Sequence, residues 1–150
     1  MDDRASVEAL YRDVTSAGSL SDQALALLPR GRADFERIEL LESLSLAELR
    51  PLVRHLMTWI QDSNWPISRR VGAILLRLGP AVLLEPIREV LATSDAIWKT
   101  NTIRSLIRPL RADLVQGLRV ELLRISEAPS GSEIAEDTAE AARDVLAVPL

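Results

Sequence analysis

The sequence contains no cysteine, which excludes disulfide bonds, thiol catalysis and cysteine-ligated zinc. Its 150 residues include one histidine, three tryptophans, one tyrosine and one phenylalanine. No apolar run approaches the roughly 20 residues that cross a bilayer. The charged stretch from Met1 to Ser6 also lacks the apolar segment of a signal peptide. These absences predict a soluble, cytoplasmic protein with no membrane partner.

The charge balance is mildly acidic, with a formal net charge of −4. A protein that binds nucleic acid usually presents a basic face to the phosphates, so this balance disfavours a nucleic-acid partner. Leucine and alanine supply most of the apolar residues, while the aromatic and β-branched residues typical of strands are comparatively few. The composition therefore predicts an all-α fold.

Apolar residues recur at helical spacing along almost the whole chain. The pattern predicts helices over residues 7–17, 22–28, 33–43, 45–61, 66–78, 81–92, 98–109, 112–126 and 133–147. Ser45 and Glu48 have the spacing of a capping box, and Pro51 should split the first turn from the helix that follows. Ser63 or Asn64 is expected to cap the helix that begins near Pro66.

Several side chains can be placed on these helices. Phe35 is expected on the inner face of its helix, whereas His55 shares a face with polar residues and should be exposed. Pro86 is expected to interrupt its helix. Residues 112–126 carry the clearest apolar stripe, which consists of Val115, Leu118, Leu122 and Ile125.

An internal repeat is visible at an offset of 33 residues. Trp65 and Trp98 are separated by this offset, and so are Ile74 and Ile107. The spacing suits stacked helical hairpins, because one hairpin alone cannot bury its apolar face. We expect a single domain over residues 1–150, with an N-terminal helical arm at 1–27 and a repeat core at 28–147.

Two resemblances support this reading. The segment Asp62-Ser63-Asn64-Trp65-Pro66-Ile67-Ser68-Arg69-Arg70-Val71 resembles the loop and second helix of a HEAT-type repeat. A wider set of motifs resembles the bacterial family known as domain of unknown function 5071: Leu28-Pro29, Asp34-Phe35, Trp59, Gln61-Asp62, Asn64-Trp65-Pro66, Asp95, Trp98-Lys99, Leu123-Arg124 and Ala128-Pro129. The resemblance implies a HEAT-like α-α superhelix and no established activity.

The candidate site follows from the tryptophans and their polar neighbours. Tryptophan often anchors protein interfaces, although tryptophans in repeats also pack between hairpins. The candidate protein-binding residues are Trp59, Asp62, Asn64, Trp65, Arg69, Trp98 and Lys99. Lys99 would be a reactive amine if desolvated, but a lysine that covers Trp98 with its stem is favoured.

Arginines recur on the two equivalent helices. They are Arg69, Arg70, Arg77, Arg104, Arg108 and Arg111. These residues form either a local basic stripe or, as we favour, a solvated face paired with Glu85, Glu89 and Asp113.

The sequence lacks a phosphate-binding glycine loop, a dinucleotide fingerprint, a serine elbow and a metalloprotease helix. We therefore expect no catalytic residue, no cofactor and no metal, and we favour a scaffold that binds another protein. Two alternatives stay open. One is an enzyme similar to the HEAT-like DNA glycosylases, with Trp65, Asp62 and Arg69 near the nucleotide; the other is a homo-oligomeric structural protein.

Overall fold

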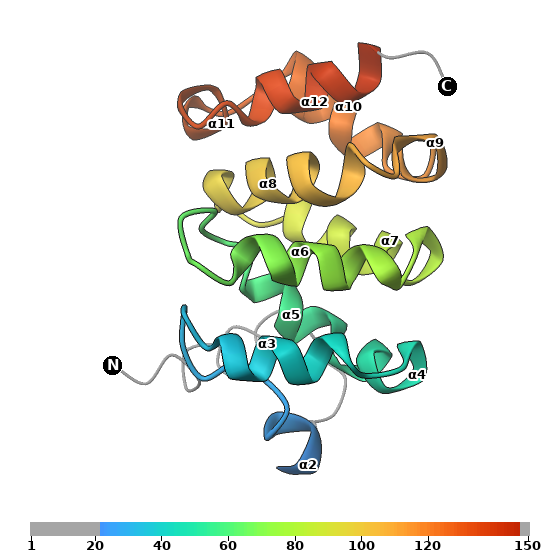
Figure 1. Cartoon of the computed structure of the whole chain (residues 1–150). Helices are drawn as coiled ribbons and strands as arrows, with labels where there is room; N and C mark the ends of the chain where they lie inside the picture. The colour runs from blue at the N-terminus through green and yellow to red at the C-terminus, as the bar shows by residue number, and fades with distance from the viewer. Residues whose placement is uncertain (1–21, 148–150) are drawn as a thin grey trace. The chain divides into compact units, whose positions relative to one another are not determined.

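The computed structural model describes residues 22–147, and every regular element in this range is helical (Figure 1). The predicted all-α class is therefore confirmed. The expected helix at residues 7–17 lies outside the described residues. The chain divides after Gly79 into two compact units, named unit 1 and unit 2 here. The single-domain organisation stays a prediction.

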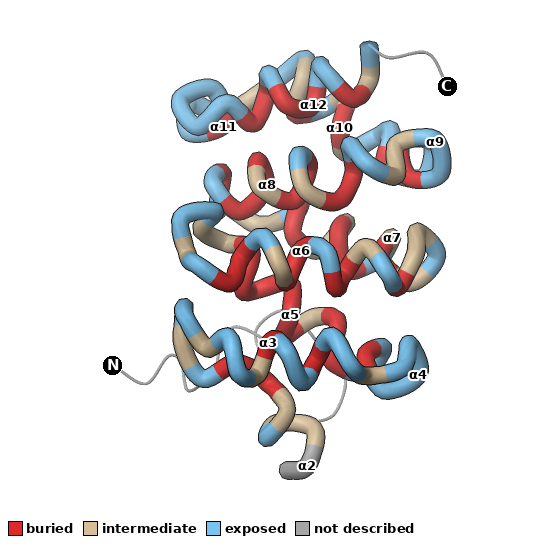
Figure 2. Tube along the Cα trace, in the orientation of Figure 1, coloured by how far each residue is buried: buried red, intermediate tan, exposed pale blue. Residues whose placement is uncertain are grey.

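Unit 1 combines short helical turns with two longer helices. Its elements are α2 (Asp22–Leu25), α3 (Phe35–Glu42), α4 (Leu46–Leu49), the 3-10 turn η1 (Arg50–Leu52), α5 (Val53–Thr58) and α6 (Ser68–Arg77). α6 packs against both α3 and α5. The largest buried side chains of the unit are Ile38, Leu41, Leu49, Leu52, Leu56, Met57, Trp59, Ile60, Ile67, Ile74 and Leu75. In α6 the buried positions recur at helical spacing (Figure 2).

The predicted capping box opens α4. The Glu48 amide donates to Ser45 Oγ at 3.2 Å, and the Ser45 amide donates to Glu48 Oε1 at 3.1 Å. Pro51 lies in the 3-10 turn that follows, as predicted. The next helix, α5, has no solvent-facing side, because each of its residues other than Arg54 is buried. The prediction that His55 is exposed is therefore wrong, since its exposed fraction is 1%.

α3 begins after Asp34, whose carboxylate accepts a hydrogen bond from the Arg37 amide at 3.2 Å. The prediction that Phe35 faces inward is wrong, because Phe35 is 41% exposed. It occupies the first position of the helix and lies under Arg70 of α6, whose Cζ is 5.9 Å from the ring centroid. This cation–π contact and the ion pair between Arg70 and Glu42 join the two helices.

Unit 2 begins with its longest helix. Its elements are α7 (Pro80–Leu91), α8 (Ala96–Thr102), the π turn η2 (Ile103–Ile107), α9 (Arg111–Leu114), α10 (Arg119–Glu127), α11 (Gly131–Ala135) and α12 (Thr138–Ala147). α12 packs against α8, α10 and α11, while α7 packs against α8 and α9. The predicted interruption at Pro86 is wrong, since α7 continues through it.

Two expected helices of unit 2 are each divided in the structure. Residues 112–126 form α9 and α10, although all four residues of the predicted apolar stripe are buried. Residues 133–147 are divided between α11 and α12 at Asp137, whose φ of 60° ends the first helix. Aspartate is one of the few residues that adopt this conformation readily.

α8 ends in a wide turn. The Arg108 amide donates to the Ile103 carbonyl at 2.9 Å, five residues back, and Pro109 has no amide hydrogen with which to continue the pattern. The helix therefore breaks at Pro109, as predicted. Within residues 22–147, no helix is long and apolar enough to cross a membrane.

Candidate functional site

The loop between α5 and α6 holds two of the three tryptophans in contact. Trp59 has an exposed fraction of 1%, whereas Trp65 is partly exposed. Their ring centroids are 5.6 Å apart with an interplanar angle of 61°, an edge-to-face arrangement. Such pairs contribute about 0.5–1.5 kcal/mol beyond their burial. The buried ring thus fixes the orientation of the partly exposed one.

Backbone hydrogen bonds hold this loop. Asp62 Oδ1 accepts from the Asn64 amide at 2.8 Å, and the Trp65 amide donates to the Asp62 carbonyl at 3.2 Å. The Ile67 amide donates to the Arg32 carbonyl at 3.1 Å, which ties the loop to the segment before α3. The chain therefore turns sharply at Asp62 before α6 starts.

The expected cap of this helix is wrong. α6 begins at Ser68, its N-cap residue is Ile67, and no side chain accepts a hydrogen bond there. Asn64 takes part in the turn at Asp62 instead, through its own amide. The residue type alone did not distinguish a helix cap from a turn, because Asn and Asp occur in both.

Four of the predicted residues lie on this loop or in the first turn of α6, and they are called the Trp65 surface here: Asp62, Asn64, Trp65 and Arg69. Arg69 is exposed, as are Arg30 and Arg32 in the segment bonded to Ile67. The guanidinium groups of these three arginines make no ion pair with other residues that the structure describes. Two of these exposed arginines, Arg32 and Arg69, therefore belong to the segments that flank the loop of Trp65.

Trp98 and Lys99 lie in unit 2, within the first turn of α8. Asp95 caps this helix, and its Oδ1 accepts from the Trp98 amide at 3.0 Å. Both Trp98 and Lys99 are only 4% exposed. The prediction that Lys99 lies over Trp98 at the surface is wrong, because Lys99 Nζ donates to Glu133 Oε2 at 2.9 Å inside the unit.

The Glu133 carboxylate accepts hydrogen bonds from three residues: Arg124, Ser130 and Lys99. Arg124 binds both of its carboxylate oxygens, at 2.6 and 2.8 Å, and the Ser130 amide donates to it at 2.9 Å. The Arg124 hydrogen bonds, followed by those from the Ser130 amide and Lys99, hold the pKa of Glu133 far below its usual 4.5, although burial acts in the opposite direction. Glu133 is therefore a buried carboxylate that holds its charge.

The hydroxyl groups of Thr100 and Thr138 add further hydrogen bonds between α8 and the last two helices. Thr100 Oγ1 and Thr138 Oγ1 are 2.7 Å apart, and Thr138 Oγ1 donates to the Ala96 carbonyl at 3.1 Å. Thr100 Oγ1 also lies 2.8 Å from the Glu136 carbonyl. These contacts join α8 to α11 and α12, so Trp98 and Lys99 belong to the interior of unit 2.

The arginines of the predicted stripe differ in whether they have partners among the described residues. Arg70 pairs with Glu42, and Arg77 donates to the carbonyls of Glu42 and Leu44 at 3.2 and 3.1 Å. Glu85, expected to pair with the stripe, pairs with Arg88 instead. Arg104, Arg108 and Arg111 make no ion pair with other residues of the described chain.

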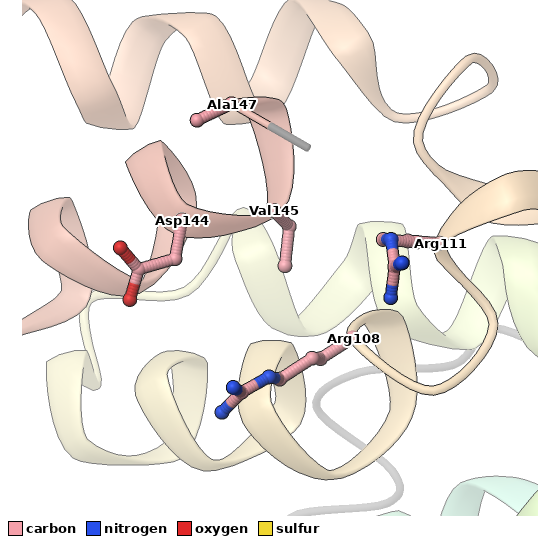
Figure 3. A pocket seen from close by; sticks show the side chains of 5 residues that line it. All are labelled: Arg108, Arg111, Asp144, Val145 and Ala147. Carbon is pink, nitrogen blue, oxygen red and sulfur yellow. The ribbon is translucent and has the colours of Figure 1, made fainter. Parts of the chain in front are cut away.

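Unit 2 contains a pocket of about 570 Å³ that was not predicted from the sequence (Figure 3). It is lined by Arg108, Arg111, Asp144, Val145 and Ala147. One signal was available, since neither arginine has an acidic residue three or four positions away along the chain. Within residues 22–147, no group of three or more histidine, aspartate or glutamate side chains is placed to hold a metal ion.

These features define an all-helical protein whose partly exposed tryptophan and arginine-lined pocket lie in separate units. The chain belongs to the family described as domain of unknown function DUF5071, whose model matches residues 27–146. This match confirms the family resemblance drawn from the motifs. No curated protein matches the chain.

Proposed function

We propose that this protein is a protein-binding module and that the Trp65 surface is its contact site. The observation that carries the proposal is the partly exposed Trp65 ring held edge-on by the buried Trp59. Tryptophan is enriched among the residues that dominate binding energy. An aromatic ring that is already fixed loses little conformational entropy when a partner covers it.

The charge around Trp65 indicates the chemistry of the partner. Arg69, Arg30 and Arg32 are exposed, and none of their guanidinium groups is neutralised by an acid that the structure describes. Guanidinium groups bind carboxylates with two parallel hydrogen bonds. The proposed partner therefore presents an apolar side chain for Trp65 and an acidic residue that Arg69 or Arg32 can bind.

The buried members of the candidate set have a supporting role in this proposal. Trp59 orients Trp65, while Trp98 and Lys99 hold unit 2 together. Each of the three is at most 4% exposed. The contact is accordingly assigned to Asp62, Asn64, Trp65 and Arg69.

A HEAT-like arrangement and a cytoplasmic location are parts of the same proposal. Packing of α6 on α3 and α5, and of α12 on α8 and α10, supports paired helices within each unit. The 33-residue offset between Trp65 and Trp98 supports a repeat. The absence of cysteine supports a reducing compartment.

The test is affinity capture from the native cell with the tagged full chain and three variants. Trp65→Ala removes the indole, and Arg69→Glu reverses the charge of one flanking arginine. Leu46→Ala is the matched control, because Leu46 is 49% exposed in the same unit but lies on α4. We expect a partner that is retained by the wild type and by Leu46→Ala and lost by the other two variants.

Circular dichroism of each variant verifies that its helical content is unchanged. Capture of the same proteins by Trp65→Ala and the wild type, with the fold intact, would remove the proposal. Light scattering separates a second copy of this chain from a different partner. A wild-type dimer that Trp65→Ala converts to a monomer would assign the surface to self-association.

A further inference from the structure

The pocket in unit 2 brings together residues from two separate segments. Arg108 follows the π turn η2, Arg111 begins α9, and Asp144 and Val145 belong to α12. Figure 3 shows the Arg108 side chain extending past Val145 toward the side on which Asp144 lies. Pro109 restricts the backbone between the two arginines, and π turns occur frequently at functional sites. The two cationic groups therefore project from a constrained segment.

The arginines of this pocket differ from two other arginines of unit 2. Arg88 binds Glu85 and Glu121, and Arg124 binds Glu133. Arg108 and Arg111 bind no carboxylate among residues 22–147, although both line the same cavity. In Figure 3 Arg111 lies on the other side of Val145 from Asp144, so the two arginines offer separate unpaired cationic groups to a ligand in the cavity. A planar carboxylate matches the hydrogen-bonding fork of a guanidinium.

Asp144 adds a negative charge to the lining of the same pocket. It lines the same cavity, is exposed, and makes no ion pair with the described residues. A multiply charged anion such as phosphate would be repelled by this carboxylate. A ligand that carries an ammonium group as well as a carboxylate would satisfy Asp144 and the two arginines together.

We propose that this pocket binds a small zwitterionic molecule, of the size of a short peptide, through its carboxylate at Arg108 and Arg111 and its ammonium group at Asp144. The volume of about 570 Å³ lies within the range of roughly 300–1,000 Å³ typical of small-molecule sites. Ala147 supplies the exposed apolar part of the lining, since Val145 is only 2% exposed. This inference does not depend on the Trp65 surface, which lies in the other unit.

Isothermal titration calorimetry of the full chain provides the test. The probe is the dipeptide alanyl-leucine, compared with its N-acetyl form, which lacks the ammonium group, and its amide, which lacks the carboxylate. We expect saturable binding of the dipeptide and affinities lower by about tenfold or more for both derivatives, because each derivative leaves one charge of the pocket unmatched. Inorganic phosphate, the fourth probe, is expected to bind weakly or not at all.

Substitutions of the pocket residues test which side chain binds which end of the dipeptide. Arg108→Gln and Arg111→Gln should each lower dipeptide affinity about tenfold or more. Asp144→Asn should lower it and raise the affinity for the N-acetyl form, because the carboxylate that this form leaves unmatched is removed. Arg119→Gln is the control, because Arg119 is exposed on α10 and is not among the residues that line the pocket. Trp65→Ala should bind the dipeptide normally.

Three results would overturn the inference: no dipeptide binding at millimolar concentration, phosphate binding as tight as dipeptide binding, or an equal effect of Arg119→Gln and Arg108→Gln. Circular dichroism of each variant separates loss of binding from loss of fold. Failure here leaves the proposal for Trp65 intact, since that proposal is tested by partner capture.

Discussion

Two segments with the same aspartate-to-tryptophan spacing adopt different local structures in units 1 and 2. Asp62 and Trp65 repeat as Asp95 and Trp98 at the same offset of 33 residues. In unit 1 the aspartate closes a turn and the tryptophan stays in a loop, partly exposed. In unit 2 the aspartate caps a helix and the tryptophan lies in its first turn, buried.

One residue accounts for much of this difference. The position after each tryptophan is Pro66 in unit 1 and Lys99 in unit 2. The Lys99 amide donates to the Asp95 carbonyl at 3.0 Å, a bond of the first helical turn. Proline has no amide hydrogen, and it also disfavours helical geometry at the preceding residue. Shared residue types therefore do not ensure shared environments, and only the loop in unit 1 presents its indole to solvent.

The comparison is tested first by removing each indole. Trp98→Ala should lower the free energy of unfolding by about 3–5 kcal/mol, because it empties a buried site. Trp65→Ala should cost about 1–2 kcal/mol, since it loses an edge-to-face contact and partial burial. Urea denaturation measures both, and Trp98→Phe should restore part of the loss. Equal losses for the two alanine variants would show that the two rings are buried alike.

Ser130 and Glu133 form a capping box at the start of α11, as Ser45 and Glu48 do at α4, and the two boxes give a second contrast. Glu133 in unit 2 has an exposed fraction of 1%, whereas Glu48 in unit 1 is exposed. Glu133→Ala should cost about 3 kcal/mol, because it leaves the buried Lys99 ammonium without its carboxylate. Glu48→Ala removes an equivalent backbone contact in water and should cost distinctly less. Urea denaturation of both variants at neutral pH measures the difference.

The dependence of stability on pH tests the ion pairs of Glu133 independently. The pKa of Glu133 is lowered in the folded state, so its stabilising contribution is complete above its usual value of 4.5 and declines as the pH falls below that value. The stability advantage of the wild type over Glu133→Gln should therefore shrink between about pH 5 and about pH 3. An advantage that stays constant over this range would contradict the ion pair.

The helical class, most apolar stripes and the Ser45–Glu48 box could be predicted because they depend on residues a few positions apart. His55 was misplaced because its helix was expected to keep one side toward solvent, whereas five of the six residues of α5 are buried. The partner of Lys99 was beyond reach, since Glu133 is 34 residues away in the sequence. The pocket residue Asp144 was missed for the same reason, because α12 brings it to Arg108 only in the folded unit.

The smallest and most direct perturbation is Pro66→Ala. The new amide hydrogen can donate to the Asp62 carbonyl, as Lys99 does to Asp95, so α6 should begin about one turn earlier. We expect a stability change within about 1 kcal/mol, because the gain of a helical bond is offset by a more flexible unfolded chain. Backbone chemical shifts of residues 63–67 measure the change of conformation, with Pro51→Ala as a control at a proline outside this loop.

An extended α6 would also draw Trp65 into its first turn, where Trp98 lies in α8. Partner capture should then weaken in Pro66→Ala even though the indole is still present and the fold is intact. If the loop keeps its shape instead, its conformation must come from the Trp59 contact and the bond between Ile67 and Arg32. In that case the proline would not be the cause of the difference between the two units.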